Sequence, residues 1–589
     1  MPQPASAPPP PGRGCAPAAA RASARLAPDA RARPPAAVQV VNRDLSIAVL
    51  RLFERRRREE AEAGVGPKPW RLRHSALGAL DLQSPLAPLL IPAETLSTLR
   101  ESVAAHNAQA EADDWPEEEE AAEAEEGGAA AEADGGAEEA PEGEADAAEE
   151  GDEPKPRKPQ PPPAPMRILE GLSASGLRAF RYAQEVPHVG VVVANDMDPV
   201  AAAAIRRNKA FGGDAVAAVV AHQSDARIVM MTHEKLFDVV DLDPYGTPCT
   251  LLDSAVQAVA EGGLLCVTAT DMAVLCGNAS EVCWTKYGSY PVKIKACHEL
   301  ALRTLLASIQ AAAVRHRRHI VPVLSVSIDF YVRVFVRLYT SPSAAKESAS
   351  KHSYIYLCTG CESRTLQPLG RIGERATGSK RFMPGGGPVV GDTCEHCGGK
   401  HVMGGPIWSD PIHDFQAVRE LRAMVAAERD AFPAFDKVHA LLTTVEEELP
   451  DVPLYESMHG LASTLKCTPP PAVLMRSALI NAGFRVSSTH ASPLGLKTDA
   501  PMRAVWDVLR CWVREHPVKA RDVETPGSRI LAKAPELEAN FSRARGAFSK
   551  AQEDHVKRYT SNPEANWGPK MRHGRVAPDA PPAKKPREQ

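Results

Sequence analysis

Four consecutive residues, Asp243-Pro244-Tyr245-Gly246, combine groups that could activate an exocyclic amine of a nucleobase. Such an amine is a poor nucleophile because its lone pair is delocalised into the ring. A carboxylate and a backbone carbonyl that accept its two N–H bonds return electron density to the nitrogen and orient it. Pro244 fixes the turn without adding a competing N–H donor, and Tyr245 can stack on the base. The simpler alternative is a strand that ends in a tight Asp-Pro turn.

Asp241 competes with Asp243 for the role of the acidic group. It lies two residues earlier, so both side chains share one face for as long as the strand continues. We favour Asp243 because it adjoins the proline at the strand end, where parallel sheets bind their ligands. The D-P-Y-G sequence also resembles the D-P-P-Y motif of amino-group methyltransferases.

Earlier strand ends carry residues that suit a nucleoside cofactor. Residues 170–179 are rich in small side chains, which allow a sharp turn and a close approach of the backbone to a ligand, but they lack the G-x-G-x-x-G pattern. Asp196, about 20 residues after this loop, could accept both ribose hydroxyls, and Asp225 could accept an adenine amine. Asp198 precedes a proline and instead has the features of a helix N-cap. Capping is an equally good explanation for Asp225.

These side chains need a scaffold on which several strand ends meet, and the chain predicts one from residue 166 on. We expect strands at 167–170, 189–195, 217–221, 237–241 and 264–269, and helices at 177–184, 199–209, 226–231 and 248–260. Such alternation is typical of an α/β fold with a doubly wound, mostly parallel sheet of the Rossmann-like type. Ligands of these sheets bind at the carboxyl ends of the strands.

Composition indicates a nucleic-acid partner and argues against a membrane protein. Residues 111–153 hold 21 acidic and no basic side chains, so the formal net charge of −5 becomes +16 without them. A basic surface is expected for a protein that binds a phosphate backbone. No apolar stretch is long enough to span a membrane, and 12 cysteines in 589 residues do not suggest a disulfide framework.

We divide the chain into six parts by composition. They are a basic Ala/Pro-rich tail or transit peptide at 1–36, the first part of a methyltransferase-like domain at 37–110, an acidic and Pro-rich insert at 111–165, the Rossmann-like domain at 166–340, a C-terminal α+β domain at 341–540 and a basic tail at 541–589. The insert interrupts a domain, and such insertions cost little stability. In 37–110, a helix face is expected from Leu45, Ile47, Ala48, Val49 and Leu52.

Two cysteine pairs in the C-terminal domain have the spacing of a zinc site. Cys358 and Cys361 form one C-x-x-C pair, and Cys394 and Cys397 form the other. Four thiolates complete a tetrahedral zinc site, so a structural zinc is predicted and a catalytic metal is not. His396, between the second pair, is interpreted as a polar bystander.

Long motifs dispersed over residues 40–108 and 165–575 resemble the tRNA guanine-26 N2-dimethyltransferase family. They are Asn42-Arg43-Asp44-Leu45-Ser46, the loop at 170–179, Ala194-Asn195-Asp196, Asp225-Ala226, Asp243-Pro244-Tyr245-Gly246, Thr268-Ala269-Thr270-Asp271, Gly405-Pro406-Ile407-Trp408, Ser488-Thr489-His490, the segment 493–501 and the segment 562–569. Family members usually have an acidic, strand-forming segment before the N-R-D motif. Here that region is rich in Pro and Ala, so we expect a different or incomplete start.

The resemblance implies transfer of one and then two methyl groups from S-adenosylmethionine to N2 of guanosine 26 in tRNA. The family's cofactor contacts fall on Arg43, Arg178, Asp196, Asp225 and Ala226, and its catalytic turn falls on Asp243, Pro244 and Tyr245. The guanidinium of Arg43 would reach the cofactor carboxylate. Two alternatives remain open: an amino-group methyltransferase that acts on DNA or on protein glutamine, and a non-catalytic zinc-bearing RNA-binding protein.

The remaining C-terminal sequence indicates an RNA platform. Residues 410–520 read as mainly helical, with a strong helix at 472–482 that ends at Gly483, followed by a strand and wing at 487–497. Lys497 is expected either to contact phosphate or to be a solvated surface lysine. The 11 basic and 5 acidic residues of 543–589 fit RNA attraction or a nuclear address. We therefore expect tRNA as partner and the nucleus as location, with the mitochondrion or a plastid as further compartments, and no obligate protein partner.

Overall fold

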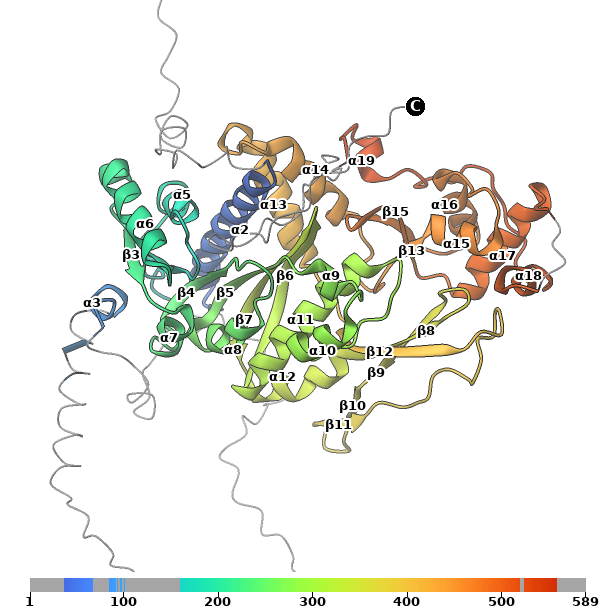
Figure 1. Cartoon of the computed structure of the whole chain (residues 1–589), viewed down its shortest axis with the longest axis horizontal. Helices are drawn as coiled ribbons and strands as arrows, with labels where there is room; N and C mark the ends of the chain where they lie inside the picture. The colour runs from blue at the N-terminus through green and yellow to red at the C-terminus, as the bar shows by residue number, and fades with distance from the viewer. Residues whose placement is uncertain are drawn as a thin grey trace, which may run out of the picture.

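The computed structural model describes residues 37–66, 84–91, 93, 96, 97, 100, 159–519 and 524–558. Its centre is a seven-stranded sheet in the order β3-β2-β1-β4-β5-β7-β6 (Figure 1). The strands are β1 (Met166–Glu170), β2 (Val189–Asp196), β3 (Val219–Gln223), β4 (Phe237–Leu242), β5 (Val259–Ala269), β6 (Arg318–Ile328) and β7 (Tyr331–Thr340). β1 to β5 pair in parallel, whereas β7 is antiparallel to β5 and to β6. The predicted mostly parallel sheet is confirmed, although β5 begins earlier than expected.

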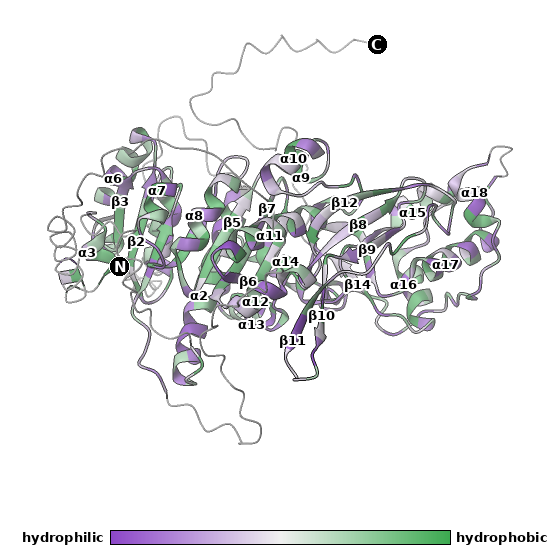
Figure 2. Ribbon diagram, turned by 90° about the horizontal axis from the view of Figure 1, so that it is seen from below, coloured by the Kyte–Doolittle hydropathy of each residue, from purple (hydrophilic) through white to green (hydrophobic). Residues whose placement is uncertain are grey.

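Helices cover both faces of this sheet and enclose two hydrophobic cores. The first core takes residues from α3 (Ala87–Leu90), α7 (Ala226–Met231), α8 (Cys249–Ala258) and α11 (Cys297–Arg315). The second takes residues from α2 (Ala37–Glu62), α5 (Leu177–Glu185), α6 (Pro199–Gly212), α13 (Phe415–Ala427) and α14 (Phe435–Glu446). Because both faces are covered, the central strands are hydrophobic along their length (Figure 2).

Helix α2 joins the N-terminal part of the described chain to the sheet. All five of its predicted apolar residues are buried, from Leu45 to Leu52. At its other end, Arg56 donates to Asp414 at 2.7 Å and to Glu420 at 3.0 Å. The helix is therefore held by apolar packing and by ion pairs to α13. The predicted tail at 1–36, the acidic residues 111–153 and the basic residues after 558 lie outside the described residues.

A second part of the molecule contains the four predicted zinc ligands. Its strands are β8 (His352–Cys358), β9 (Arg364–Pro368) and β12 (His401–Trp408), which form one sheet, and β10 (Gly370–Glu374) and β11 (Lys380–Pro384), which form a hairpin. The cysteines share a core with α15 (Met458–Leu465), α16 (Ala472–Asn481), α17 (Met502–Glu515) and α18 (Pro526–Leu531). The last helix among the described residues is α19 (Lys550–Glu553).

The local predictions for this region agree with the structure. The predicted helix at 472–482 is α16, and Gly483 follows it with φ +89, the left-handed conformation that favours glycine at a helix end. The predicted strand and wing are β14 (Val486–Thr489) and β15 (Ser492–Thr498), which pair with each other and with β13 (Glu456–Ser457).

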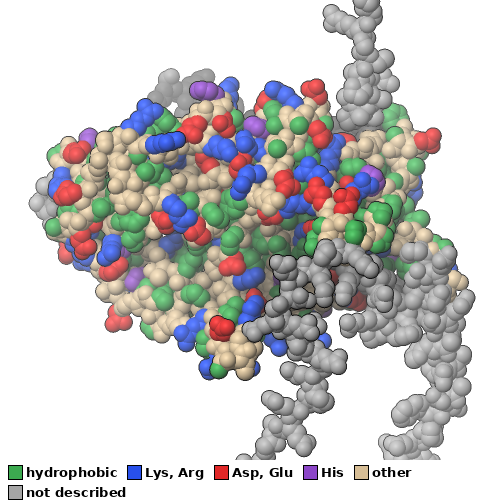
Figure 3. Space-filling model, turned by 180° about the vertical axis from the view of Figure 1, so that it is seen from behind, with side chains coloured by type: hydrophobic (Ala, Val, Ile, Leu, Met, Phe, Trp, Pro, Cys, Tyr) green, Lys and Arg blue, Asp and Glu red, His purple; other side chains and the backbone are tan. Residues whose placement is uncertain are grey.

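Two observations concern the surface and the helices that the structure describes. On the face opposite to that of Figure 1, basic, acidic and hydrophobic side chains are interspersed (Figure 3). Within the described ranges, no helix has the length and apolar character needed to cross a membrane.

Candidate active site

The loops that follow the first strands are joined by hydrogen bonds at the carboxyl edge of the sheet. The side-chain amide of Asn195, in β2, donates to the carbonyls of Gly171 and Ser224, both at 3.0 Å. The Ser173 amide donates to the Asn195 carbonyl at 2.8 Å, and the Gly171 amide donates to the Asp241 carbonyl of β4 at 3.0 Å. The strand ends that carry the predicted cofactor and catalytic residues therefore form one continuous site.

Asp241 is a buried carboxylate whose hydrogen-bonding positions are taken by the protein. Its side chain is 0% exposed and accepts from Arg333 at 2.9 Å, from Arg178 at 3.1 Å and from the Tyr182 hydroxyl at 2.5 Å. Burial alone would raise the pKa of Asp241, but the positive charges of Arg333 and Arg178 hold it below its usual value. Asp241 therefore has no free oxygen position for a substrate amine.

Asp243 lies just beyond the end of β4 and is open to solvent. Its side chain is 20% exposed, and one carboxylate oxygen accepts a hydrogen bond from Nη2 of Arg178. Pro244 is buried behind it, whereas Tyr245 is 68% exposed. The turn presents a carboxylate and an aromatic ring at the strand end, which is the arrangement that an amine-binding turn requires.

Two arginines face this carboxylate from α5 and α2. Arg178 spans Asp241 and Asp243, and its Nε lies 3.6 Å from Glu170. Arg43 forms no hydrogen bond or ion pair with any residue that the structure describes. Burial and the positive charge of Arg178 lower the pKa of Arg43 to about 10, while Glu170 and Asp243 oppose this shift. An unpaired guanidinium here suits an anionic ligand such as a carboxylate.

Asp196 lies beside the small-residue loop, as predicted. Its carboxylate accepts from the Ala174 amide at 2.8 Å and from the Asp198 amide at 3.0 Å. Asp198 caps α6 by accepting from the Val200 amide at 2.8 Å, which confirms the predicted N-cap. Asp196 is thus fixed against the loop while it stays partly exposed.

Asp225 is a helix cap in the structure, which is the alternative that the sequence left open. It accepts from the Arg227 amide at 2.8 Å and forms an ion pair with the Arg227 side chain, whose hydrogen bonds lower the pKa of Asp225. Ala226 is buried, and its Cβ is 3.6 Å from the position that a Cβ on Gly171 would take. Both residues lie at the shared edge, and their contact with a cofactor stays a prediction.

Glu170 is a member of this site that the sequence pattern alone did not single out. It is 4% exposed and accepts from the Ser173 hydroxyl and, at 3.1 Å, from the Ala179 amide. Burial raises its pKa to about 7, and the positive charge of Arg178 opposes the shift. The sequence did contain one indication that Glu170 belongs to the site: it is the last strand residue before the small-residue loop.

We expect Glu170→Gln to flatten the pH dependence of stability. The native state keeps the Glu170 proton up to about pH 7, whereas the unfolded state loses it near 4.5, so the free energy of unfolding falls as the pH rises between these values. A shift of this size corresponds to about 3 kcal/mol. Denaturant titrations at pH 5 and pH 8 measure the difference, with the exposed Glu374→Gln as control. Identical pH slopes in parent and Glu170→Gln would contradict the assignment.

The four cysteines converge as predicted. Their Sγ atoms all lie within 4.8 Å of one another, with 3.4 Å between Cys358 and Cys397 and 3.7 Å between Cys361 and Cys394. Tetrahedral zinc with Zn–S bonds of about 2.3 Å requires sulfurs roughly 3.8 Å apart. His396 is not part of the cluster.

The surroundings of the cysteines fit a zinc ion. A Cβ on Gly360 would lie 3.0 Å from Sγ of Cys397, and a Cβ on Gly399 would lie 3.0 Å from Sγ of Cys358, so only glycine fits without displacement. The Gly360 amide donates to Sγ of Cys358 at 3.3 Å. Four buried sulfurs supported by a backbone amide form a closed, structural type of site.

Lys497 contradicts both interpretations made from the sequence, because it is neither a surface lysine nor free for a phosphate. Its side chain is 2% exposed, donates to Glu299 at 3.0 Å and lies 3.4 Å from Glu448. Both carboxylates are about 1% exposed. Buried carboxylates require a counter-charge, and β15 supplies it at Lys497.

A neighbouring cluster of His413, Glu448 and His490 has metal-like spacing, but backbone amides already occupy the lone pair of each imidazole ring. Nδ1 of His413 accepts from the Ser325 amide, and Nε2 of His490 accepts from the Ser327 amide, both at 3.2 Å. Each neutral ring therefore carries its proton on the other nitrogen. His490 uses that proton to donate to Glu448 at 2.6 Å. The cluster positions the Glu448 carboxylate and links β6 to the hairpin formed by β14 and β15.

We expect Lys497→Met to destabilise the protein by about 3–5 kcal/mol, because it removes a cation shared by two buried carboxylates and leaves Glu299 with Arg303 and Glu448 with His490 as side-chain partners. Denaturant unfolding followed by far-UV circular dichroism measures this loss. Lys346→Met, at an exposed position on α12 (Pro342–Glu347), is the matched control and should be neutral. Equal stabilities of the two variants would contradict the buried-network assignment.

The fold and the site define a class of protein. A Rossmann-like sheet with a small-residue loop after β1, an acid at the end of β2 and a D-P-Y-G turn after β4 is a methyltransferase fold with a nucleoside-cofactor site.

Comparisons with known proteins define the family. The family model described as N2,N2-dimethylguanosine tRNA methyltransferase matches residues 36–510. The tRNA (guanine(26)-N(2))-dimethyltransferase 2 of Arabidopsis thaliana is 53% identical over 421 residues, 71% of each chain. The Homo sapiens tRNA (guanine(26)-N(2))-dimethyltransferase is 44% identical over 412 residues, 69% of this chain and 62% of that one. A solved complex of Trm1 from Pyrococcus horikoshii with S-adenosyl-L-methionine is 28% identical, with a TM-score of 0.49, and covers 58% of this chain and 87% of that one.

The chain belongs to the N2,N2-dimethylguanosine tRNA methyltransferase family. It is therefore an S-adenosylmethionine-dependent enzyme that methylates N2 of guanosine in tRNA, as the motifs predicted.

Proposed function

We propose that this enzyme transfers two methyl groups in succession to N2 of guanosine 26 in tRNA and that Asp243 is its catalytic carboxylate. The observation that carries the proposal is the contrast between two acids of one strand end. Asp241 is buried and its oxygens are fully occupied, whereas Asp243 is partly exposed and has only Arg178 as partner among the described residues. The position on tRNA is the one in the names of the Arabidopsis and human relatives.

The chemistry follows from the two hydrogen-bond acceptors that this turn offers. Asp243 and the Pro244 carbonyl accept the two N–H bonds of the guanine amine, which raises the electron density on nitrogen. S-adenosylmethionine, when bound, would supply the methyl group from its sulfonium, with the S–CH3 bond breaking and its electron pair remaining on sulfur as a neutral thioether. As the N–C bond forms, the nitrogen becomes cationic, and Asp243 removes one proton as general base. One N–H remains after the first transfer, so the same turn can serve a second.

The guanine must leave its stack to reach the turn. Tyr245 is exposed beside Asp243 and is placed to stack on the extruded base. The ring then limits the rotation of the base, while the carboxylate fixes the edge that carries N2.

The cofactor residues are those that the family resemblance implies. Arg43, unpaired among the described residues, would bind the cofactor carboxylate, and Asp196 would accept the ribose hydroxyls. Asp225 and Ala226 would contact the adenine. Arg178 faces the same space, but its guanidinium already bridges two carboxylates, so we assign it also the task of holding Asp243.

Zinc at Cys358, Cys361, Cys394 and Cys397 has a structural role in this proposal. The sulfur spacing and the close glycines support it. The cluster lies in the core of the C-terminal helices and not at the sheet edge. The ion would thus stabilise the part of the protein that we expect to bind tRNA.

The test of the function is mass spectrometry of nucleosides from tRNA incubated with the protein and S-adenosylmethionine. The expected products are N2-methylguanosine at early times and N2,N2-dimethylguanosine later, with a guanosine-26 substitution abolishing both. Methyl groups on another base, on DNA or on glutamine would overturn the proposal.

For the location we propose the nucleus, with a second pool in the mitochondrion or a plastid. The basic C-terminal sequence supports the first, and the Arg-rich, acid-poor residues 1–36 share the bias of transit peptides. A relative from Saccharomyces cerevisiae is named as mitochondrial. Imaging of fluorescent fusions with and without residues 1–36 tests the organelle address.

A further inference from the structure

The segment between β5 and α11, residues 270–296, connects the catalytic turn to the zinc-bearing part of the molecule. We call it the bridging segment. It contains α9 (Met272–Leu275) and α10 (Ser280–Tyr287), which stand on the face shown in Figure 1 and project from the body in Figure 2.

One end of the bridging segment is fixed to the catalytic turn. The Thr270 amide donates to the Gly246 carbonyl at 2.9 Å, and the Thr270 hydroxyl accepts from the Gly246 amide at 2.7 Å. The next residue, Asp271, accepts from Lys286 at 3.0 Å and from the Tyr287 hydroxyl at 2.6 Å. Helix α10 is therefore anchored beside the turn that carries Asp243.

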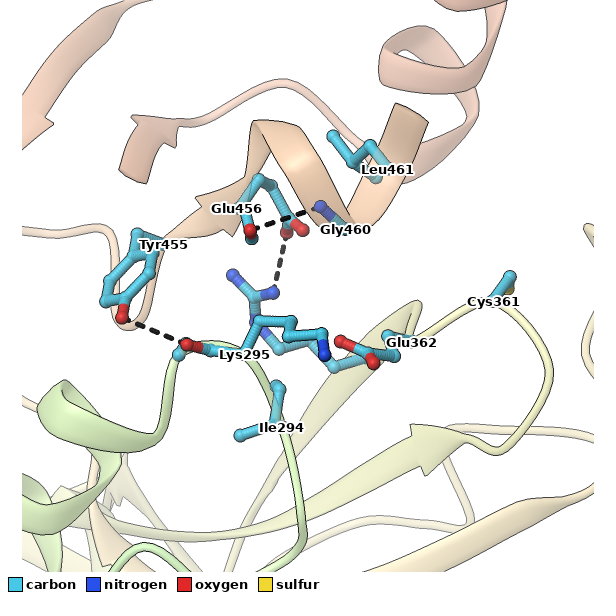
Figure 4. Close-up of a pocket in the computed structure, with 11 residues that line it drawn as sticks. Ile294, Lys295, Cys361, Glu362, Tyr455, Glu456, Gly460 and Leu461 are labelled. Carbon is cyan, nitrogen blue, oxygen red and sulfur yellow. Dashed lines mark hydrogen bonds and ion pairs between the residues drawn. The ribbon is translucent and has the colours of Figure 1, made fainter. Parts of the chain in front are cut away.

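The other end is fixed to the C-terminal part. The backbone of Tyr290 pairs in both directions with Gly405 of β12, at 2.9 Å. The Lys295 carbonyl accepts from the Tyr455 hydroxyl at 3.0 Å, next to the ion pair of Glu456 (Figure 4). A ligand that lies along the segment would reach both the zinc-bearing part and the catalytic turn.

The bridging segment exposes two large aromatic rings and two lysines, together with the acidic Glu281 of α10 and several small or polar residues. Trp284 is 54% exposed and Tyr290 is 47% exposed, although large rings are normally buried. Lys293 and Lys295 are exposed and form no ion pair with any described residue. Exposed rings interleaved with unpaired cations are the features that bind unstacked bases and phosphates.

We propose that the bridging segment is a tRNA-binding surface, in which Trp284 and Tyr290 stack on bases and Lys293 and Lys295 neutralise phosphates. The inference rests on the proposed function for the identity of the RNA. It adds a place where the strand next to the extruded guanosine is held, between the zinc-bearing part and Tyr245.

The experiment compares tRNA binding by the full-length protein and its variants, measured by fluorescence anisotropy without S-adenosylmethionine. Trp284→Ala and Tyr290→Ala should each weaken binding about tenfold, since stacking of one base is lost. The double variant Lys293→Ala/Lys295→Ala should reduce the slope of log K against log salt by about 2. Trp284→Phe should keep most of the affinity. Cofactor affinity and thermal stability should not change, because the altered side chains are exposed.

The controls are matched substitutions on α6. Phe211→Ala removes a ring that is 58% exposed, and Arg206→Ala/Arg207→Ala removes two exposed cations. Parental tRNA affinity in Trp284→Ala and Tyr290→Ala, or equal losses in the control variants, would overturn the inference. A change of oligomeric state in place of RNA affinity would also overturn it and would identify a protein interface. If the variants lose tRNA affinity as expected but the parent protein does not methylate tRNA, the proposed function is refuted and the binding surface is not.

Discussion

Replacing Asp243 with alanine is expected to lower kcat for tRNA methylation by roughly 10²–10⁴-fold, the usual contribution of a positioned general base. The cofactor affinity should stay within a few-fold, because Arg178 is the only residue assigned to the cofactor that bonds to Asp243 among the described residues, and Asp241 still holds Arg178. Steady-state methylation of tRNA with labelled cofactor measures kcat, single-turnover reactions measure the methyl-transfer step, and calorimetry measures cofactor binding.

Two variants separate the catalytic role of Asp243 from a structural one. Asp243→Asn keeps the shape and the contact with Arg178 but cannot take a proton, so it should be nearly as slow as Asp243→Ala. Asp253→Asn, an exposed acid on α8, is the matched control and should be fully active. If Asp243→Ala methylates tRNA at the parental rate, the proposed mechanism is wrong.

Loss of the proposed zinc is expected to have the largest effect on stability. Structural zinc sites bind with apparent free energies on the order of 10 kcal/mol, and Cys361→Ser should remove most of it. Because the cysteines share their core with α15 to α18, these helices should lose hydrogen-exchange protection. The sheet has its own cores, so its protection and cofactor binding should persist. The loss of activity should then follow from the loss of tRNA binding.

Metal analysis and hydrogen exchange test this expectation together. The parent should contain one zinc per chain and Cys361→Ser none, whereas Cys467→Ser, a cysteine outside the cluster, should keep the metal. Unchanged protection of α17 in Cys361→Ser would contradict a structural role for the ion.

The sequence predicted the central sheet well because its signals are local. Each strand is a short apolar run bounded by a turn, and Asp198 and Gly483 mark a helix start and a helix end by their own chemistry. The choice between Asp241 and Asp243 was not local. Alternation puts both on one face, and the decisive partner of Asp241 is Arg333 in β7, a distant part of the chain.

Lys497 shows the same limit in the C-terminal region. A lysine in a short strand usually points to solvent, and nothing nearby in the sequence indicates otherwise. Its partners, Glu299 of α11 and Glu448, become visible only when the chain is folded. Glu170 differs, because its position before the loop was visible but its burial and shifted pKa were not.

The packing of α2 has a consequence for protein synthesis in the cell. Ser46 of α2 accepts a hydrogen bond from Arg333, 287 residues later, and the partner of Arg56 on α13 lies 364 residues later. At ribosomal rates of about 5–20 residues per second, roughly 20–70 seconds pass before α13 emerges. During this time α2 can pack only against the parts of its core that precede α13, such as α5, whose Arg181 pairs with Asp44. The core around α2 can therefore be completed only after α13 and α14 have been translated, near the end of synthesis of the sheet domain.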